Sequence, residues 1–257
     1  MKKQERDFIK SIRLPEAVIF DTDNTLYPYI PAHREATRAV EEKVEKMIGV
    51  KKETFRSAFE EARKEIKDRL DGVASSHSRL LYMQRTLEKL GLGTRILLTL
   101  DLEQTYWRTF LMNCKLFPSA LDFIQLLKSK GVITANITDL TAQIQFRKLV
   151  YFGMDELFNY VVTSEEAGKD KPDKRPFELV IEKLQINPKN IWMVGDDPKN
   201  DMARAGKMGM TKIQKIHKGV IVKNNGDEKP NLVFENYDEL IKIISTIERS
   251  SEHLNVI

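Results

Sequence analysis

The sequence predicts an α/β fold, in which helices cover both faces of a parallel β-sheet and an all-α segment is inserted after the first strand. Over most of the chain, short apolar runs alternate with amphipathic helical patterns, and this alternation is typical of parallel sheets. Between residues 31 and 113 the pattern is helical throughout, with no strand-like run. Proline residues near 28–31 and 115–118 indicate the linkers between the two parts.

Five apolar runs are expected to form the strands of the sheet. Amphipathic patterns around 123–127, 177–184 and 238–248 predict helices between and after them, and Gly131 ends the first of these helices. The five runs are AVIF at 17–20, VITANI at 132–137, YVVTS at 160–164, IWMVG at 191–195 and TKIQKI at 211–216.

Apolar residues of the inserted segment recur at helical spacing, so the segment is expected to form a separate helical cap. We therefore predict two domains, a core made of residues 1–28 and 117–257 and a cap made of residues 29–116. From Tyr27 to Leu116 the chain has 17 Lys and Arg against 13 Asp and Glu, and the rest has 25 of each. The cap thus carries the whole positive excess, which either attracts an anionic substrate or is a solvated helix surface.

The composition is that of an ordinary globular protein, with 41% apolar and 31% charged residues. No apolar run approaches the roughly 20 residues of a membrane span, and the basic N-terminus lacks the apolar stretch of a signal peptide. The single cysteine, Cys114, cannot form an internal disulfide, so a reducing cytoplasm is expected. A net charge of +4 is too small to indicate nucleic acid as a partner, and a monomer or homodimer is expected.

Polar side chains follow four of the expected strands. Ligands of open parallel sheets bind beyond the carboxyl ends of the strands, so these side chains are expected to share one site. They are Asp21 and Asp23, Thr138 and Asp139, Lys171, and Asp196 with Asp197 and Asp201.

Two neighbouring carboxylates, Asp21 and Asp23, are unfavourable unless a positive charge lies close to them. Mg²⁺ prefers oxygen ligands and is held by a few carboxylates, here expected to be Asp21 and Asp196. A carboxylate can attack phosphorus, a metal and an ammonium can neutralise the transferred group, and a second acid can protonate the leaving oxygen. Each motif alone also has a simpler interpretation: a turn for the two acids, a helix cap for Thr138 and a surface lysine for Lys171.

Together these motifs resemble those of the haloacid dehalogenase superfamily. The resemblance implies a Rossmann-like core and Mg²⁺-dependent phosphoryl transfer, with Asp21 as nucleophile and Asp23 as general acid and base that also offers its backbone carbonyl to the metal. It further implies that Thr138, Lys171 and the backbone N–H of Asp139 hold the phosphoryl oxygens, and that Asp201 steadies the metal site from outside the ligand set. The matching segments are FDTDNTL, VITANITD, KPDKRPF and VGDDPKNDMARAGKMGM.

One position departs from the family pattern. The second motif commonly continues with Asn-Gly, whereas this chain has Asp139 and Leu140. An extra acid beside a phosphate is unfavourable, so Asp139 is expected to point away and cap the helix that follows. Members that cleave carbon–halogen bonds lack an acid at the position of Asp23, because a halide leaves without a proton. Asp23 therefore favours phosphate esters.

The cap contributes weaker candidates. Arg79 and His77, in the polar stretch ASSHSR, could bind a carboxylate or second phosphate of the substrate, but a solvent-facing helix N-terminus capped by serine is the simpler interpretation. Further candidates near the hinge are His33, Arg34 and Tyr27, and the two tryptophans, Trp107 and Trp192, are expected in the core.

The predicted function is a cytoplasmic, Mg²⁺-dependent hydrolase of a small phosphomonoester, acting through an aspartyl phosphate. Sugar phosphates, nucleoside monophosphates and phosphoglycolate all fit the motifs. Two alternatives stay open at this point, namely a phosphomutase of the same superfamily and a binding or regulatory member without turnover.

Overall fold

The computed structural model describes residues 8, 9 and 11–254 of the 257-residue chain. One six-stranded sheet, in the order β3-β2-β1-β4-β5-β6, forms its centre, and all neighbouring strands are parallel. The predicted α/β fold is thereby confirmed. The strands are β1 (Ala17–Phe20), β2 (Ile133–Thr138), β3 (Tyr160–Thr163), β4 (Ile191–Gly195), β5 (Thr211–Lys215) and β6 (Leu232–Phe234).

The first five strands lie where apolar runs predicted them, whereas β6 was not predicted. Its three residues are too few for a periodic signal, and its pairing with β5 defines it. Strand β1 is buried on both faces, because Val18 and Phe20 belong to one hydrophobic core and Ala17 and Ile19 to another. Burial on both faces explains why its sequence is continuously apolar.

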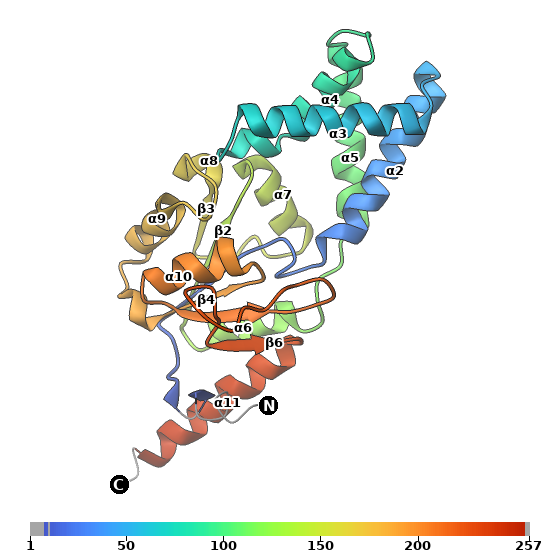
Figure 1. Ribbon diagram of the computed structural model, residues 1–257. Coiled ribbons are helices and arrows are strands. Elements are labelled where there is room, and N and C mark those ends of the chain that lie inside the picture. Colours follow the sequence, from blue (N-terminus) through green and yellow to red (C-terminus); the bar gives the residue numbers. More distant parts are fainter. Residues whose placement is uncertain (1–7, 10, 255–257) are drawn as a thin grey trace.

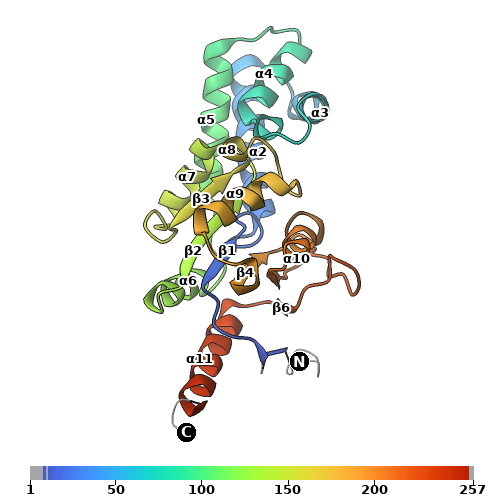
Figure 2. The ribbon, with the colours of Figure 1, turned by 90° about the vertical axis from the view of Figure 1, so that its left-hand side faces the viewer.

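Helices cover each face of the sheet (Figures 1 and 2). Helices α6 (Ala120–Ser129), α7 (Ala142–Tyr151) and α11 (Tyr237–Leu254) contribute to the core that contains Phe20, and α9 (Lys174–Leu184) and α10 (Arg204–Lys207) to the core that contains Ile19. Shorter helical turns complete the loops: η1 (Ala74–His77), α8 (Ser164–Ala167), η2 (Pro188–Asn190) and η3 (Pro198–Ala203).

Four helices of the inserted segment stand together at one end of the molecule, and α11 lies at the other end (Figures 1 and 2). They are α2 (Tyr29–Ile48), α3 (Lys52–Arg69), α4 (Arg79–Lys89) and α5 (Ile96–Met112). Gly49 ends α2 with a φ of 70°, and its N–H donates to the Glu45 carbonyl at 3.0 Å. Ser78 caps α4 by accepting the Leu81 N–H at 3.3 Å. We keep the division into core and cap domains at 28/29 and 116/117 as a proposal.

No helix within the described ranges combines the length and the apolar composition that crossing a membrane requires.

Candidate active site

Asp21 lies directly after β1 and is held at both of its carboxylate oxygens. Its backbone N–H donates to the Val194 carbonyl of β4 at 2.9 Å, which continues the sheet pairing by one residue. Thr25 Oγ1 donates to Asp21 Oδ2 at 2.9 Å, and Lys171 Nζ donates to Oδ1 at 2.6 Å. The carboxylate is therefore oriented by the protein alone.

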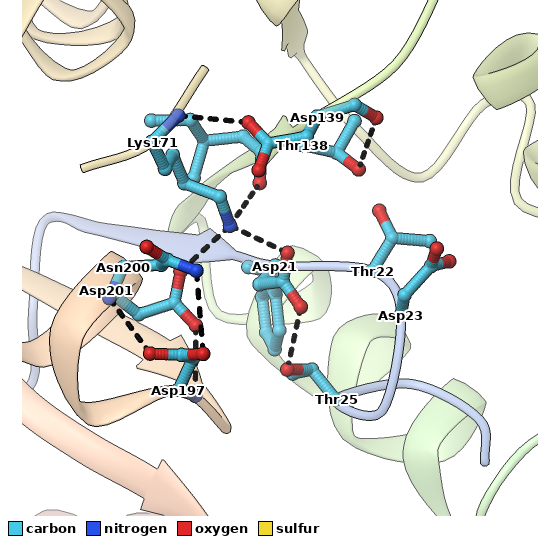
Figure 3. Close-up of polar contacts among 12 residues, drawn as sticks. Asp21, Thr22, Asp23, Thr25, Thr138, Asp139, Lys171, Asp197, Asn200 and Asp201 are labelled. Carbon is cyan, nitrogen blue, oxygen red and sulfur yellow. Dashed lines mark hydrogen bonds and ion pairs between the residues drawn. The ribbon is translucent and has the colours of Figure 1, made fainter. Parts of the chain in front are cut away.

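Lys171 lies between two acids (Figure 3). Its ammonium group contacts Asp21 at 2.6 Å and Asp201 Oδ1 at 2.7 Å, and its side chain is only 3% exposed. Burial lowers the pKa of Lys171, but the charges of Asp201 and Asp21 outweigh burial and hold this pKa well above its usual value. The lysine is thus a permanent positive charge, as the sequence motif suggested, and is not a surface residue.

Asp21, Asp196 and Asp201 form an acid cluster in which one carboxylate oxygen of each lies within 4.8 Å of the others. Burial, followed by the charges of Asp21 and Asp201, raises the pKa of Asp196 to about 9. Burial likewise raises the pKa of Asp201 to about 7, although Lys171 opposes this rise. When all three acids are ionised, the one ammonium of Lys171 leaves two negative charges uncompensated, so the acid cluster fits one divalent cation with oxygen ligands.

Asp201 reaches the acid cluster because the turn η3, which follows β4, folds back against Gly195 at the end of that strand. The turn η3 brings Asp201 Oδ2 to the Asp197 N–H at 3.1 Å, and Asp197 itself accepts the N–H of Asn200 at 2.8 Å. A side chain at Gly195 would have its Cβ 2.7 Å from the Asp201 Cβ, so only glycine fits there. The carboxylate of Asp201 lies in the acid cluster, and its oxygens accept from Lys171 and from the Asp197 N–H, so its expected role outside the ligand set stays a prediction.

Asp23 lies apart from the acid cluster and faces a different cation. In Figure 3 it lies on the far side of Asp21 from Lys171. Lys148 of α7 donates to its two oxygens at 2.8 and 3.1 Å, and the Tyr27 hydroxyl also donates to it. Burial raises the pKa of Asp23, but Lys148 and then Tyr27 outweigh burial and lower this pKa below its usual value. Asp23 is therefore held as a carboxylate.

Lys148 was missed at the level of the sequence, although a signal was present. It is four residues after the inward-facing Ile144 and directly before Leu149, and all three are buried. A lysine on the apolar face of a predicted helix is rare unless it is paired. That position could have indicated a buried acid partner, but which acid it meets depends on how α7 packs.

Thr138 and Asp139 end β2 as predicted, but the role expected for the Asp139 side chain was wrong. Its carboxylate accepts the backbone N–H of Lys171 at 2.9 Å and does not cap α7. The N–H of Ala142, at the start of α7, donates to Glu165 at 2.8 Å instead. Burial raises the pKa of Asp139 to about 6, against the lowering effect of Lys171. Asp139 thus connects the Lys171 loop to β2.

Leu140 occupies the position where the family commonly has glycine. Its φ is 92°, in the left-handed region that side chains other than glycine rarely adopt. Its N–H donates to Ser164 Oγ at 2.8 Å, and its side chain is buried. The turn geometry that suits glycine is therefore kept with leucine in place, held by this hydrogen bond and by packing.

A cavity of about 280 Å³ joins these groups to the helices α3 and α4. Ser78 does cap α4, but the stretch does not simply face solvent, because Arg79 and His77 both line the cavity. His77 Nε2 lies 3.2 Å from Asp170 Oδ2. The core-side and cap-side lining includes Asp21, Asp23, Thr138, Asp139, Lys148, Lys171, Asp196 and Asp201, together with Arg63, Lys67, His77, Arg79 and Trp107.

The other candidate residues from the sequence differ in whether they reach the cavity. Tyr27 is buried against Asp23, and His33 Nδ1 lies 2.7 Å from the Tyr106 hydroxyl. Arg34 is exposed and does not line the cavity within the part of the chain that the structure describes. Trp192 is in the core, as expected, and Trp107 is buried but also borders the cavity.

A family model described as haloacid dehalogenase-like hydrolase matches residues 15–209. The ribulose-1,5-bisphosphate 5-phosphatase of Halopiger xanaduensis is 36% identical over 195 residues, which are 76% of this chain and 82% of the relative. The glyceraldehyde 3-phosphate phosphatase of Methanopyrus kandleri is 27% identical over 91% of this chain and 99% of its own.

Solved structures share the fold. The structure of a hydrolase of the same kind from Bacillus subtilis, bound to magnesium and described as revealing interdomain movement, has a TM-score of 0.65 and 20% identity. The similarity covers 91% of this chain and 99% of that one. At this level of identity the similarity shows the fold alone.

Proposed function

Since the chain belongs to the haloacid dehalogenase-like hydrolase family, we propose that it cleaves a small phosphomonoester through an aspartyl phosphate on Asp21. Both relatives named above are phosphatases, in agreement with the predicted enzyme class. The observation that carries the mechanistic proposal is the position of Lys171, whose ammonium group contacts Asp21 and Asp201 at 2.6 and 2.7 Å. This arrangement combines an oriented carboxylate with a fixed positive charge at a pair of acids.

Asp21 is the proposed nucleophile. A carboxylate oxygen forms a bond to phosphorus while the bond from phosphorus to the ester oxygen breaks, and the leaving oxygen takes up a proton. Thr25 and Lys171 hold the two carboxylate oxygens at 2.9 and 2.6 Å, so little reorganisation precedes the attack. Water then attacks the phosphorus, which releases inorganic phosphate and restores the Asp21 carboxylate.

Asp23 is the proposed acid and base. As a carboxylate it can accept the proton of the attacking water in the second step. To donate a proton in the first step it must separate from Lys148, because that contact lowers its pKa. Lys148 and Tyr27 thus set the protonation state from which Asp23 starts.

Mg²⁺ is the proposed cofactor, held by the carboxylates of Asp21 and Asp196 and by the backbone carbonyl of Asp23, with Asp201 beside them in the acid cluster. The fit rests on the two uncompensated negative charges of the acid cluster and on its purely oxygen ligands. When bound, Mg²⁺ would neutralise the charge of the transferring phosphoryl group. Thr138 and the backbone N–H of Asp139, at the end of β2, would bind phosphoryl oxygens next to Lys171.

No observation favours the alternatives. A binding protein without turnover would not need the full set of acids, hydroxyl and lysine at one sheet edge, and nothing in the described residues points to a mutase. The cytoplasmic location, the absence of a nucleic-acid partner and the monomeric or homodimeric state stay predictions from the sequence.

The test is a panel of phosphomonoesters assayed for phosphate release with Mg²⁺ and with EDTA. We expect Mg²⁺-dependent release from at least one alkyl ester and from an aryl phosphate, with activity lost in EDTA and restored by Mg²⁺. Full activity of a metal-free preparation, verified by elemental analysis, would contradict the metal role. Absence of release from every ester would contradict the proposed function.

A further inference from the structure

Three cations of α3 and α4 line the same cavity as the acid cluster. Arg63 and Lys67 lie four residues apart in α3, and Arg79 is the first residue of α4. We call these three residues the cation cluster. All are half-buried, so their charges are not simply dispersed into solvent.

Arg79 is enclosed by neutral groups. Its Nη1 donates to the His77 carbonyl at 2.6 Å, and its Nη2 donates to the Tyr29 hydroxyl. Its guanidinium carbon lies 5.2 to 5.5 Å from the ring centres of three aromatic residues, Tyr82, Tyr106 and Trp107. Within the described ranges no carboxylate pairs with it, which is unusual for an enclosed cation.

The other two cations are scarcely compensated. Lys67 has no hydrogen bond or ion pair among the described residues, and the ion pair that Arg63 makes there, to Glu60 at 3.1 Å, is exposed. Burial, and then the charges of Arg63 and Arg79, lower the pKa of Lys67, so the three charges act on one another. Burial, and then the charges of Arg79 and Arg63, also lower the pKa of His33, to about 4. Asp170 and Glu60 raise the pKa of Lys67 and so oppose its lowering, but they rank after burial and the two arginines, and the cap side of the cavity keeps an excess of positive charge.

Resting on the function proposed above, we propose that the substrate carries a second anionic group, a phosphate or a carboxylate, bound by Arg79, Lys67 and Arg63. The scissile phosphate meets Lys171 and the acid cluster at one end of the cavity, and the second anion meets the cation cluster at the other. Arginine binds phosphates and carboxylates through two parallel hydrogen bonds. The preferred substrate class is thus a phosphorylated metabolite with two separated anionic groups.

The test compares esters that differ in the second group. Phosphate release is measured from glycerol 3-phosphate, 3-phosphoglycerate, fructose 6-phosphate, fructose 1,6-bisphosphate and p-nitrophenyl phosphate. We expect kcat/KM to be higher for fructose 1,6-bisphosphate than for fructose 6-phosphate if phosphate is bound, and higher for 3-phosphoglycerate than for glycerol 3-phosphate if carboxylate is bound. Added salt should reduce this preference, because it screens charges.

The variant that tests the site is Lys67→Met, since Lys67 has no partner whose loss would disturb the fold. Its preference for the doubly anionic ester should fall roughly 10- to 100-fold, which corresponds to the loss of a charge-assisted hydrogen bond. The loss should be mainly in KM. Lys64→Met is the matched control, because Lys64 is an exposed lysine of the same helix that does not line the cavity.

Arg79→Lys and Arg79→Met provide a second comparison. The lysine variant should keep part of the preference and the methionine variant should lose it, with thermal melting to verify that both fold. Equal kcat/KM for singly and doubly anionic esters in the wild-type enzyme would overturn this inference alone, as would an equal effect of Lys67→Met and Lys64→Met. If even p-nitrophenyl phosphate is not hydrolysed, the proposed function and this inference both fall.

Discussion

The acid cluster and the cation cluster face the same cavity, but their charges are balanced in different ways. In the acid cluster, Lys171 makes two short ion pairs. The negative charge of the ionised acids that Lys171 does not neutralise suits one divalent cation. In the cation cluster, Lys67 and Arg79 have no acid partner among the described residues. The difference is that the protein supplies an ion-pair partner to two of the three acids, whereas it supplies none to Lys67 and Arg79.

The two clusters also differ in origin. The acid cluster is formed where strands β1 and β4 end, because parallel strands bring their carboxyl ends to one edge of the sheet. The cation cluster is formed by faces of α3 and α4, in the inserted segment. Residues of the cation cluster can therefore be substituted without altering the strands that position the acid cluster.

Among the changes to these clusters, Asp21→Asn is expected to have the largest effect on turnover. The amide is a poor nucleophile and a weaker metal ligand, so turnover should fall by roughly 10⁴-fold or more. The amide oxygen can still accept from Lys171, so the circular dichroism spectrum should stay unchanged. Asp155→Asn, at an exposed loop residue, is the control. Normal phosphate release by folded Asp21→Asn would exclude the covalent mechanism.

The charge balance of the acid cluster can be tested through pH. The pKa values of Asp196 and Asp201 are raised to about 9 and about 7, so without metal these groups stabilise the fold at low pH. That contribution decreases as pH rises from 3.8, where the unfolded chain releases these protons, and is fully lost above the folded values, because only the folded chain holds the protons in between. Mg²⁺ takes the place of the protons, and the melting temperature gained from Mg²⁺ should be larger at pH 9 than at pH 6.

The size of this effect follows from mass action. Mg²⁺ at about 100 times its dissociation constant should add about 2.7 kcal/mol at the higher pH. Melting curves in EDTA and in Mg²⁺ at both pH values measure it, and Asp196→Asn should remove most of the pH dependence. The same Mg²⁺ gain at pH 6 and pH 9 would show that the acid cluster does not bind the ion.

Lys148→Met sharpens the comparison, because Lys148 is a buried cation with an acid partner, unlike Lys67 and Arg79. Its loss should destabilise the protein by about 1–3 kcal/mol at neutral pH, a moderate value because the Asp23 side chain is 35% exposed. The pKa of Asp23 is lowered, so its contribution to stability is present above pH 3.8 and lost as pH falls further.

The measurement is urea unfolding of the wild type and of Lys148→Met at pH 7 and at pH 3. The difference between them should shrink at the lower pH, and Arg147→Met, an exposed neighbour in α7, should show little change. A pH-independent difference would mean that Lys148 acts through packing and not through Asp23.

Glu165→Ala should have the smallest effect, since Glu165 belongs to neither cluster. It accepts the N–H of Ala142 at the start of α7 at 2.8 Å, and its loss should cost about 0.5–1 kcal/mol without changing the metal affinity. Urea unfolding and a Mg²⁺ titration measure the two quantities. A strong loss of Mg²⁺ binding would instead join Glu165 to the acid cluster.

Local patterns in the sequence were enough to predict the strands β1 to β5, the inserted helices and the motif residues of the core. Apolar periodicity depends on neighbouring residues alone, and the rule that parallel strands end at one edge brought Asp21, Asp196 and Lys171 together before the structure did. Strand β6 escaped detection because three residues hold no period.

Only the tertiary structure decided which charges meet. The pair of Lys148 with Asp23 joins residues 125 positions apart, and it depends on how α7 packs against the loop after β1. The Asp139 carboxylate accepts the backbone N–H of Lys171 and so does not reach α7. The two residues are far apart in the sequence, so helix-capping preferences could not predict this contact. The sequence by itself determined the elements and the reactive groups, because these follow from short-range periodicity and strand order. Their partners, protonation states and the unpaired cations of α3 and α4 were decided by packing, because burial and distance exist only in the folded chain.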